Sequence, residues 1–249
     1  MELDFKSIAD DFFVNMTLQT TMALPKSRET VLQFCEAVQR EFPAMTNFYQ
    51  REGGEFVLEA DHEPGTYSWL EMQPHRISAG YFNPTDVARA YHLHRWLLNR
   101  SVYFLGVSPL DAECLDVLFG FNLDFHGNRD AIVADALLAG SPLGGLLADP
   151  AVRPLECEPA LVLALDDACC TQAKLSFDTR SSSYQVRTGQ YEEEPISVYL
   201  TIRRYPSPGK PIDLDGSFAE QCELCEEIAC RTLVPNVVQP IAAAIAAAR

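Results

Sequence analysis

Apolar side chains occupy every second position near the start of the chain, between residues 12 and 24. Such alternation predicts a β-strand with one buried face. Pro25 ends this strand, because proline cannot donate to a sheet ladder. The side chains expected on the buried face are Phe12, Val14, Met16 and Leu18.

A helix is predicted next, from Ser27 as N-cap to Pro43, which ends it. Its apolar positions recur at helical spacing and comprise Val31, Phe34, Cys35, Val38 and Phe42. Two strand-like stretches follow, around 48–60 and 66–82, and a Gly53-Gly54 turn interrupts the first.

A second helix is expected after Asn83-Pro84-Thr85-Asp86. In this reading Asn83 is the N-cap and Pro84 occupies the first helical position. The helix buries one side, made of Val87, Ala90, Tyr91, His94, Leu97 and Leu98.

The second half of the chain repeats this order of elements. A strand is predicted over 115–126, with alternate apolar residues from Leu115 to Phe125, and a Gly127-Asn128 turn caps a helix over 129–139. Further strand-like runs span 160–167, 172–178, 183–189 and 196–205. A last helix is predicted to begin at Ser217, which forms a capping box with Glu220. The Ala-rich tail, 235–249, favours a further short helix, which needs a packing partner to be stable.

The repetition predicts an α+β fold with a duplicated β-α-β-β(-β)-α unit, 1–110 and 111–249. Because each unit has one apolar sheet face, the two joined edge to edge would give one long, mainly antiparallel sheet with helices on one face. The order of elements resembles the saddle of the TATA-binding-protein-like folds. The alternative interpretation is a single irregular α+β domain.

The acidic net charge of the chain makes negatively charged partners unfavourable. The formal net charge is −16, from −5 in residues 1–110 (14 acidic, 9 basic) and −11 in residues 111–249 (21 acidic, 10 basic). Nucleic acids and anionic membranes repel such a chain, so neither is expected as a partner. The N-terminal residues lack the basic and apolar character of a secretory signal, so we expect no export. No apolar run of about 18 residues stands out, so we expect no membrane-spanning helix. The cysteines are then expected to be reduced thiols in the cytoplasm.

Three cysteines, Cys222, Cys225 and Cys230, form a C-x2-C-x4-C pattern, which can belong to a metal or redox site. A zinc site needs four ligands, and only Cys169-Cys170 could add one through the fold. Cys222 and Cys225 also lie on the apolar stripe of Phe218. We therefore favour buried core cysteines and expect no metal and no cofactor.

Asp124, His126 and Asn128 form a D-x-H-x-N run at the end of a predicted strand. A carboxylate beside an imidazole can make a general base, so Asp124 and His126 are the candidate catalytic residues, against a solvent-facing turn as the simpler interpretation. His92 and His94 are spaced for a helix on which they point apart, and His94 is expected to be half-buried with one hydrogen bond. Other polar groupings are Glu71 with His75, His62-Glu63 and Glu192-Glu193-Glu194.

Nucleotide-binding and common hydrolase motifs are absent, with no G-x-G-x-x-G, G-x-x-x-x-G-K-[ST], G-x-S-x-G or H-E-x-x-H. The sequence therefore favours a non-catalytic module that binds a partner protein or self-associates. Tyr67, Trp69 and Tyr199 are candidates on the open sheet face, and the alternative is that strand parity buries them. The alternative is a small-molecule-binding protein or hydrolase-like enzyme. Its pocket would lie between the halves or under the Gly- and Pro-rich connector 140–159.

Overall fold

The computed structural model describes residues 5–149, 151–207 and 209–248. It has one nine-stranded antiparallel sheet with the strand order β2-β3-β4-β5-β1-β6-β9-β8-β7. The predicted α+β class with one large antiparallel sheet is therefore confirmed. The strands are β1 (Asp11–Thr20), β2 (Met45–Gln50), β3 (Phe56–Ala60), β4 (Tyr67–Gln73), β5 (Arg76–Phe82), β6 (Ala112–Asp124), β7 (Leu161–Ala164), β8 (Thr171–Asp178) and β9 (Pro195–Arg204).

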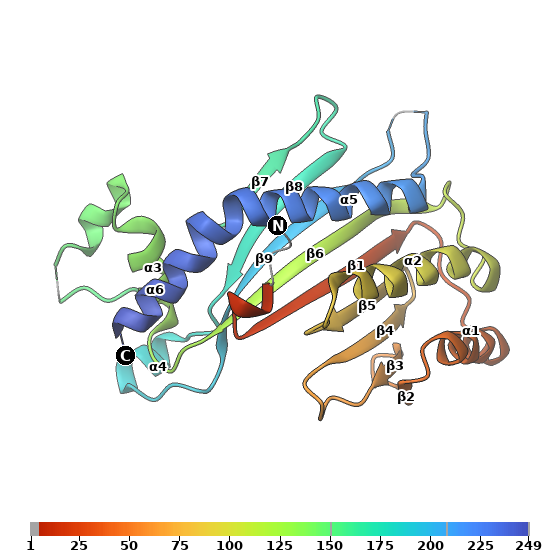
Figure 1. The fold of residues 1–249 in the computed structure, drawn as a ribbon, viewed down its shortest axis with the longest axis horizontal. Coiled ribbons are helices and arrows are strands. Elements are labelled where there is room, and N and C mark those ends of the chain that lie inside the picture. Colours follow the sequence, from red (N-terminus) through yellow and green to blue (C-terminus); the bar gives the residue numbers. More distant parts are fainter. Residues whose placement is uncertain (1–4, 150, 208, 249) are drawn as a thin grey trace.

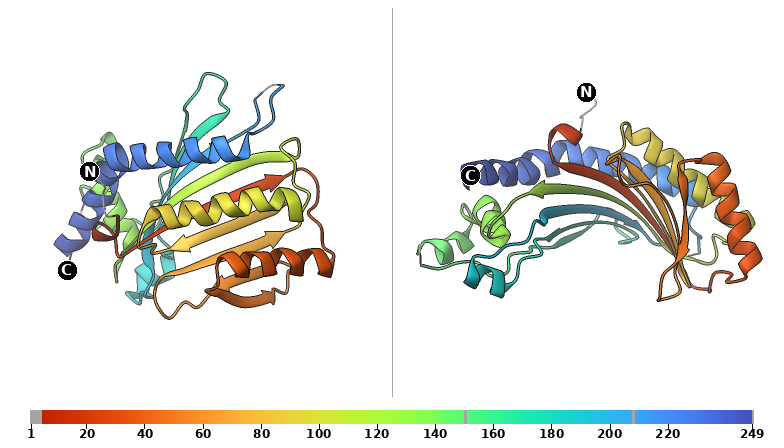
Figure 2. Two further views of the ribbon diagram at one scale, coloured as in Figure 1. Left: turned by 45° about the vertical axis from the view of Figure 1, so that its right-hand side comes forward. Right: turned by 90° about the horizontal axis from the view of Figure 1, so that it is seen from below.

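The main helices cover one face of the sheet, and the sheet arches around the opposite, concave face (Figures 1 and 2). Helices α1 (Arg28–Glu41) and α2 (Val87–Phe104) pack over the β1–β5 side. Helix α5 (Leu214–Ile228) lies on β6 and β9, and it continues through a π-helical turn region, η3 (Ala229–Val238), into α6 (Gln239–Ala248). The smaller elements are η1 (Phe5–Ser7), α3 (Arg129–Leu138), η2 (Pro142–Leu147) and α4 (Ser183–Thr188).

Strand parity decides which face each side chain takes. In β1 the even-numbered residues are buried under the helices, and in β6 the odd-numbered ones from Leu115 to Leu123 are, as the alternation of the sequence predicts. The central core of stacked and edge-on aromatic rings forms here, from Phe5, Phe12, Phe119 and Phe121. The odd-numbered residues of β1 and the even-numbered residues of β6 from Asp116 to Asn122 consequently face the concave side.

Several predicted boundaries are wrong for identifiable reasons. Helix α2 begins at Val87 with Asp86 as its N-cap, because the Asn83 side chain instead bonds the backbone N–H of Phe12 and the Asp11 carboxylate. Helix α5 begins at Leu214 with Asp213 as N-cap, one turn before Ser217. Residues 183–189 are not a strand: Ser182 and Gln185 form a capping box that starts helix α4.

The C-terminal tail is part of a continuous helical segment, Leu214–Ala248, in which Pro235 coincides with the π-helical region. Ile241 and Ile245 of α6 are buried, and α6 packs on α3. The tail thus finds its packing partner within its own chain. This segment is also long and apolar enough to cross a membrane by length and composition only, a test that a core helix passes as well, and 33% of the relevant window is buried here. The expectation of no spanning segment stays a prediction.

The two halves of the chain share a pattern but differ in detail. The first half has four strands after its first helix, α1, whereas the second half has three after α3, with α4 between β8 and β9. Strands β1 and β6, the first strand of each half, pair at the middle of the sheet. The duplication remains a prediction.

Candidate functional site

The concave face of the sheet carries the largest grouping of polar and aromatic side chains that point away from the core. Cross-strand pairing sets them in rows. One row runs Trp69, Gly80, Asn15, Leu118, Thr201, Lys174 and Val162, from β4 to β7. The next row runs Glu71, Ser78, Thr17, Asp116, Arg203 and Gln172.

These two rows line an open cleft of about 350 Å³, which we call the central cleft. Its walls come from both halves of the chain, because β1, β4 and β5 supply one side and β6, β7, β8 and β9 the other. The volume lies at the lower end of the range for small-ligand pockets, and the cleft mixes apolar and polar groups. Its lining residues are Asn15, Thr17, Trp69, Glu71, Arg76, Ser78, Asp116, Leu118, Val162, Gln172, Lys174, Thr201 and Arg203.

Two carboxylates in the central cleft are held by guanidinium groups. Asp116 accepts from Nε and Nη2 of Arg203 at 2.7 and 2.6 Å, and this hydrogen bonding raises the pKa of Arg203. Glu71 accepts from Arg51 at 2.5 Å and from Gln73 at 2.6 Å, and Arg76 lies 3.7 Å away. Both oxygens of each carboxylate are therefore already hydrogen-bonded within the protein.

Lys174 differs from the other cations of the central cleft. It is exposed, and among the described residues Arg76 and Arg203 form ion pairs while Lys174 forms none. Its ammonium group is therefore available to a negatively charged group of a ligand or partner.

An adjoining cleft of about 230 Å³, the aromatic cleft, shares Asn15 and Trp69 with the central one. Tyr67, Phe82 and Phe13 stack in sequence, with ring centroids 5.0 and 5.8 Å apart. All three aromatic residues named from the sequence line one or both clefts, so their predicted position on the open face is found here. The lining is Phe13, Asn15, Tyr67, Trp69, Phe82, Asn122, Arg180 and Tyr199.

Two glycines let the rings of Phe13 and Trp69 lie close against the sheet. A Cβ atom at Gly120 would come within 2.1 Å of the Phe13 ring, and one at Gly80 within 2.4 Å of the Trp69 indole nitrogen. Any other residue at either position would lift the ring that covers it. Both glycines therefore define the shape of the clefts.

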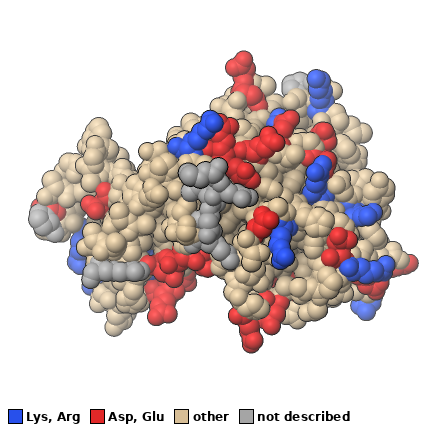
Figure 3. Space-filling model, in the orientation of Figure 1, with Lys and Arg blue, Asp and Glu red and all other residues tan. Residues whose placement is uncertain are grey.

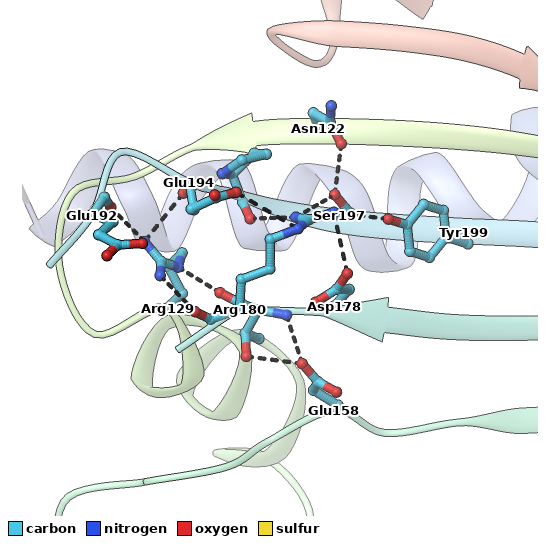
Figure 4. A network of polar contacts seen from close by, with 11 residues as sticks. Asn122, Arg129, Glu158, Asp178, Arg180, Glu192, Glu194, Ser197 and Tyr199 are labelled. Atoms are coloured by element: carbon cyan, nitrogen blue, oxygen red, sulfur yellow. Dashed lines mark hydrogen bonds and ion pairs between the residues drawn. The ribbon is translucent and has the colours of Figure 1, made fainter. Parts of the chain in front are cut away.

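A network of polar contacts fixes the end of the aromatic cleft (Figure 4). Arg180 donates to the carbonyl of Pro195, to Ser197 Oγ and to the hydroxyl of Tyr199, at 2.9–3.0 Å. Beside it, Arg129 is fully buried and donates to four backbone carbonyls, those of Thr179, Arg180, Glu192 and Glu194. Burial lowers the pKa of Arg129, and the carbonyl dipoles compensate its charge.

The candidate catalytic residues Asp124 and His126 lie outside both of these clefts. They line a third cleft of about 530 Å³, together with Phe125, Glu193, Glu194 and Ala248. Asp124 is exposed at the end of β6, and its backbone N–H donates to Asp10 Oδ2 at 2.7 Å. The His126 ring is 6.5 Å from the Tyr191 ring. The structure thus brings the two residues to one cleft and adds two carboxylates that their sequence motif does not contain.

The C-x2-C-x4-C cysteines lie under the sheet. Cys222 and Cys225 are buried, and the Cys225 thiol is 3.7 Å from the carbonyl oxygen of Val117. Burial raises the pKa of Cys222, Cys225 and the less buried Cys230. Burial thus disfavours the thiolate form of these side chains, which is the form that ligates a metal or acts as a nucleophile. Within residues 5–149, 151–207 and 209–248, no group of three or more His, Cys, Asp and Glu side chains could hold a metal ion.

The histidines of α2 point apart, as expected for a helix. His92 is exposed and 3.3 Å from Glu41, whereas His94 is fully buried edge-on to Phe218. The expectation of a half-buried, hydrogen-bonded His94 is wrong, because neither ring nitrogen has a partner. Burial lowers the pKa of His94 to about 3, so the ring is neutral at pH 7.

The remaining polar groupings serve local structure. His62 stacks on Tyr67 and is 3.4 Å from Glu59, and the carbonyl of His75 accepts from the N–H of Thr20. The carbonyls of Glu192 and Glu194 serve Arg129. Sequence reasoning missed the Asp116–Arg203 pair and the Arg129 network. Strand parity places Asp116 and Arg203 on the polar face of their strands, but only the β6–β9 register sets them opposite each other.

A comparison with known proteins gives no family for this chain. No protein family matches it, and none of the curated proteins matches its sequence. The functional argument therefore rests on the geometry of the concave face.

Proposed function

We propose that this protein is a non-catalytic binding protein, and that it holds a partner protein on the concave face of its sheet. The observation that carries the proposal is the continuity of the central and aromatic clefts through Asn15 and Trp69. Together they offer stacked rings at one end and charged groups at the other. Tyrosine, tryptophan and arginine are the residues enriched in protein interfaces.

The charges of the central cleft favour binding over catalysis. Both oxygens of Asp116 and of Glu71 already accept hydrogen bonds from side chains of the protein, which include Arg203 and Arg51. These carboxylates orient the guanidinium groups. The exposed ammonium of Lys174 then supplies an attractive point for an acidic side chain of the partner.

The position of the central cleft between the two halves agrees with a duplicated origin, which we propose as the finer description of the fold, with units 1–110 and 111–249. In a duplicated protein the pseudo-twofold axis would run perpendicular to the sheet, between the antiparallel strands β1 and β6. A cytoplasmic location, with reduced thiols and no nucleic acid, membrane or cofactor among its partners, belongs to the same proposal.

Mutation of the concave face tests the proposal. The partner is isolated by affinity capture from the native cell, purified, and titrated calorimetrically against the wild type, Trp69→Ala and Lys174→Glu. We expect each variant to bind about tenfold or more weakly, as for residues at the centre of an interface. Arg231→Gln, on the exposed surface of the long helical segment, is the matched control and should bind within about twofold. Equal affinity of all four proteins would contradict the proposal.

A second candidate function has a specific observation in its favour. Asp124, His126, Glu193 and Glu194 line one cleft, and a carboxylate with an imidazole is the minimal equipment of a hydrolase-like enzyme or a small-molecule site. His126→Ala would then abolish turnover or binding of the small molecule and leave partner binding at the concave face intact. Native mass spectrometry of the purified protein, compared with His126→Ala, detects such a ligand directly.

A further inference from the structure

Strand β7 is the outermost strand of the sheet, and all its side chains are exposed. It belongs to the run Leu161-Val162-Leu163-Ala164-Leu165, which contains no polar residue. Sheets normally protect such an edge with charges, prolines or a covering element. A continuous apolar run is instead typical of a strand that is covered on both faces.

The side chains of β7 are apolar on both faces. Val162 pairs with Lys174 and faces the concave side, whereas Leu161 and Leu163 pair with Leu175 and Ala173 and face the helix side. The main contacts of the helices with the sheet, within the described residues, are to β1, β2, β5, β6 and β9. The exposed fractions of Leu161, Val162 and Leu163 are consequently 53, 56 and 49%.

The connector before β7 also carries exposed apolar side chains. Within the described residues, eight of the fifteen exposed large apolar side chains fall between residues 143 and 165. Single exposed apolar residues are ordinary, whereas such a concentration along one segment of the chain is typical of a segment that contacts a partner. The eight are Leu143, Leu146, Val152, Leu155, Leu161, Val162, Leu163 and Leu165.

The backbone of β7 also has free positions. The N–H of Leu165 donates to Thr171 of the neighbouring strand, and bonding directions alternate along a strand. The N–H and C=O groups of Val162 and Ala164 therefore point away from β8, toward the open edge. This is the arrangement that accepts an added strand.

The charged residues on both sides of β7 indicate what kind of strand could pair with it. Glu156 and Glu158 precede the apolar run, and Asp166 and Asp167 follow it. Acidic side chains stand at the tip of the β7–β8 hairpin, at the top of Figure 3. None of the four is in an ion pair within the described part of the chain. A second copy paired through the same strand would bring these like charges together, whereas basic residues would be attracted.

We propose that the outer edge of β7 takes up one further strand, an extended apolar segment of a partner protein with Lys or Arg on both sides of its apolar core. The added strand completes the hydrogen bonds of Val162 and Ala164 and covers the leucines. This surface is distinct from the central and aromatic clefts, although Val162 borders the central one. The edge site holds or fails independently of binding on the concave face.

The test uses two labelled peptides with the full-length protein. Both have a Val-Ile-Val-Thr-Val core, one with two lysines at each end and the other with two glutamates. Fluorescence anisotropy should show at least about tenfold tighter binding of the basic peptide at low salt. Hydrogen exchange should show new protection of the Val162 and Ala164 amides when the basic peptide is bound. Equal binding of the two peptides, or no protection of these amides, overturns the proposal.

A proline variant separates strand addition from apolar contact alone. Ala164→Pro removes the outward N–H, and proline is tolerated at such an edge position, so the pairing of β7 with β8 remains. We expect about tenfold weaker binding of the basic peptide, and binding within about twofold for the matched control Ala164→Val. Amide exchange of Leu163 and Leu165 verifies that the β7–β8 ladder is intact.

The remaining outcomes are also decisive. Trp69→Ala should bind the basic peptide like the wild type, so a loss in that variant overturns the edge site and places the peptide on the concave face. Sedimentation that shows a dimer of the wild type and a monomer of Ala164→Pro overturns the proposal in favour of a second copy. Unchanged binding by Ala164→Pro overturns it as well.

Discussion

Asp116 and Arg203 face each other across the β6–β9 pair, and both carboxylate oxygens accept from the one guanidinium. The pair lies at the middle of the concave face, where the central strand β6 pairs with β9. The guanidinium also lies over the Tyr205 ring. Arg203 is thereby fixed in one orientation, and the floor of the central cleft keeps its shape without a bound partner.

The strength of this pair can be measured by a double-mutant cycle with Asp116→Asn and Arg203→Gln. Asp116 is mostly buried and Arg203 about a third exposed, so we expect each single change to cost about 1–3 kcal/mol and the coupling to be about 1 kcal/mol. Urea unfolding gives these values. Arg231→Gln, which breaks an exposed pair with Glu227, should change stability by less than about 0.5 kcal/mol. A coupling near zero would show that the pair does not hold the cleft.

Removal of the buried imidazole should change the pH dependence of stability. The folded-state pKa of His94 is about 3, below its ordinary value of 6.5, so the unfolded chain binds a proton that the folded chain excludes. Stability is therefore fully present above pH 6.5 and falls as the pH decreases toward 3, by roughly 4–5 kcal/mol from this group. His94→Leu should flatten this slope.

Urea unfolding at pH 7, 5.5 and 4 measures the effect. The exposed His92, changed to leucine, provides the control and should leave the slope as in the wild type. If His94→Leu and the wild type lose stability in parallel on acidification, the protein does not bury a neutral imidazole between α2 and α5.

Arg129 should be essential to the end of the sheet next to the aromatic cleft. Arg129→Met leaves four backbone carbonyls without their donor, and we expect a loss of about 3–5 kcal/mol. Arg129→Lys keeps the charge but has fewer donors in a different geometry, so an intermediate loss is expected. Hydrogen exchange should increase first in residues 189–195. Local exchange that matches the wild type would show that the loop is held by other contacts.

The two glycines under the aromatic rings predict a compensating pair of mutations. Gly120→Ala should cost about 1–3 kcal/mol, because its methyl group would meet the Phe13 ring. Phe13→Ala in the same chain removes the obstruction, so the double variant should be less destabilised than the sum of the two single changes. Thermal unfolding of the three variants measures this. Strictly additive losses would mean that Phe13 does not lie on Gly120.

The alternation of apolar residues was sufficient to predict most of the strands, and N-cap residues were sufficient to predict where some of the helices begin. The alternation of Phe12, Val14 and Met16 and of the apolar residues in β6 is decisive, because one face of each strand is covered by helices. Helices α1 and α3 begin where Ser27 and Asn128 predict. At Asn83 the prediction was wrong, since a side chain that can cap a helix can equally bond a neighbouring strand, and the sequence does not say which.

The concave face could be predicted only in part. Tyr67, Trp69 and Tyr199 could be named as candidates for it, but parity alone left open whether they face the helices or the open side, and the structure places them on the clefts. The clefts depend on the order and register of nine strands, which bring Glu71, Asp116 and Lys174 from distant segments into one place. No local signal in the sequence encodes that order.

Site-specific photocrosslinking in the native cell tests the central claim most directly. A benzoylphenylalanine is placed at Leu118, in the central cleft, or at Glu223, exposed on α5 on the opposite side of the sheet. We predict a covalent adduct of one discrete mass from position 118, lost when Trp69→Ala and Lys174→Glu are added, and none of that mass from position 223. An adduct that forms only at position 223, or one at 118 that survives both changes, would contradict binding on the concave face.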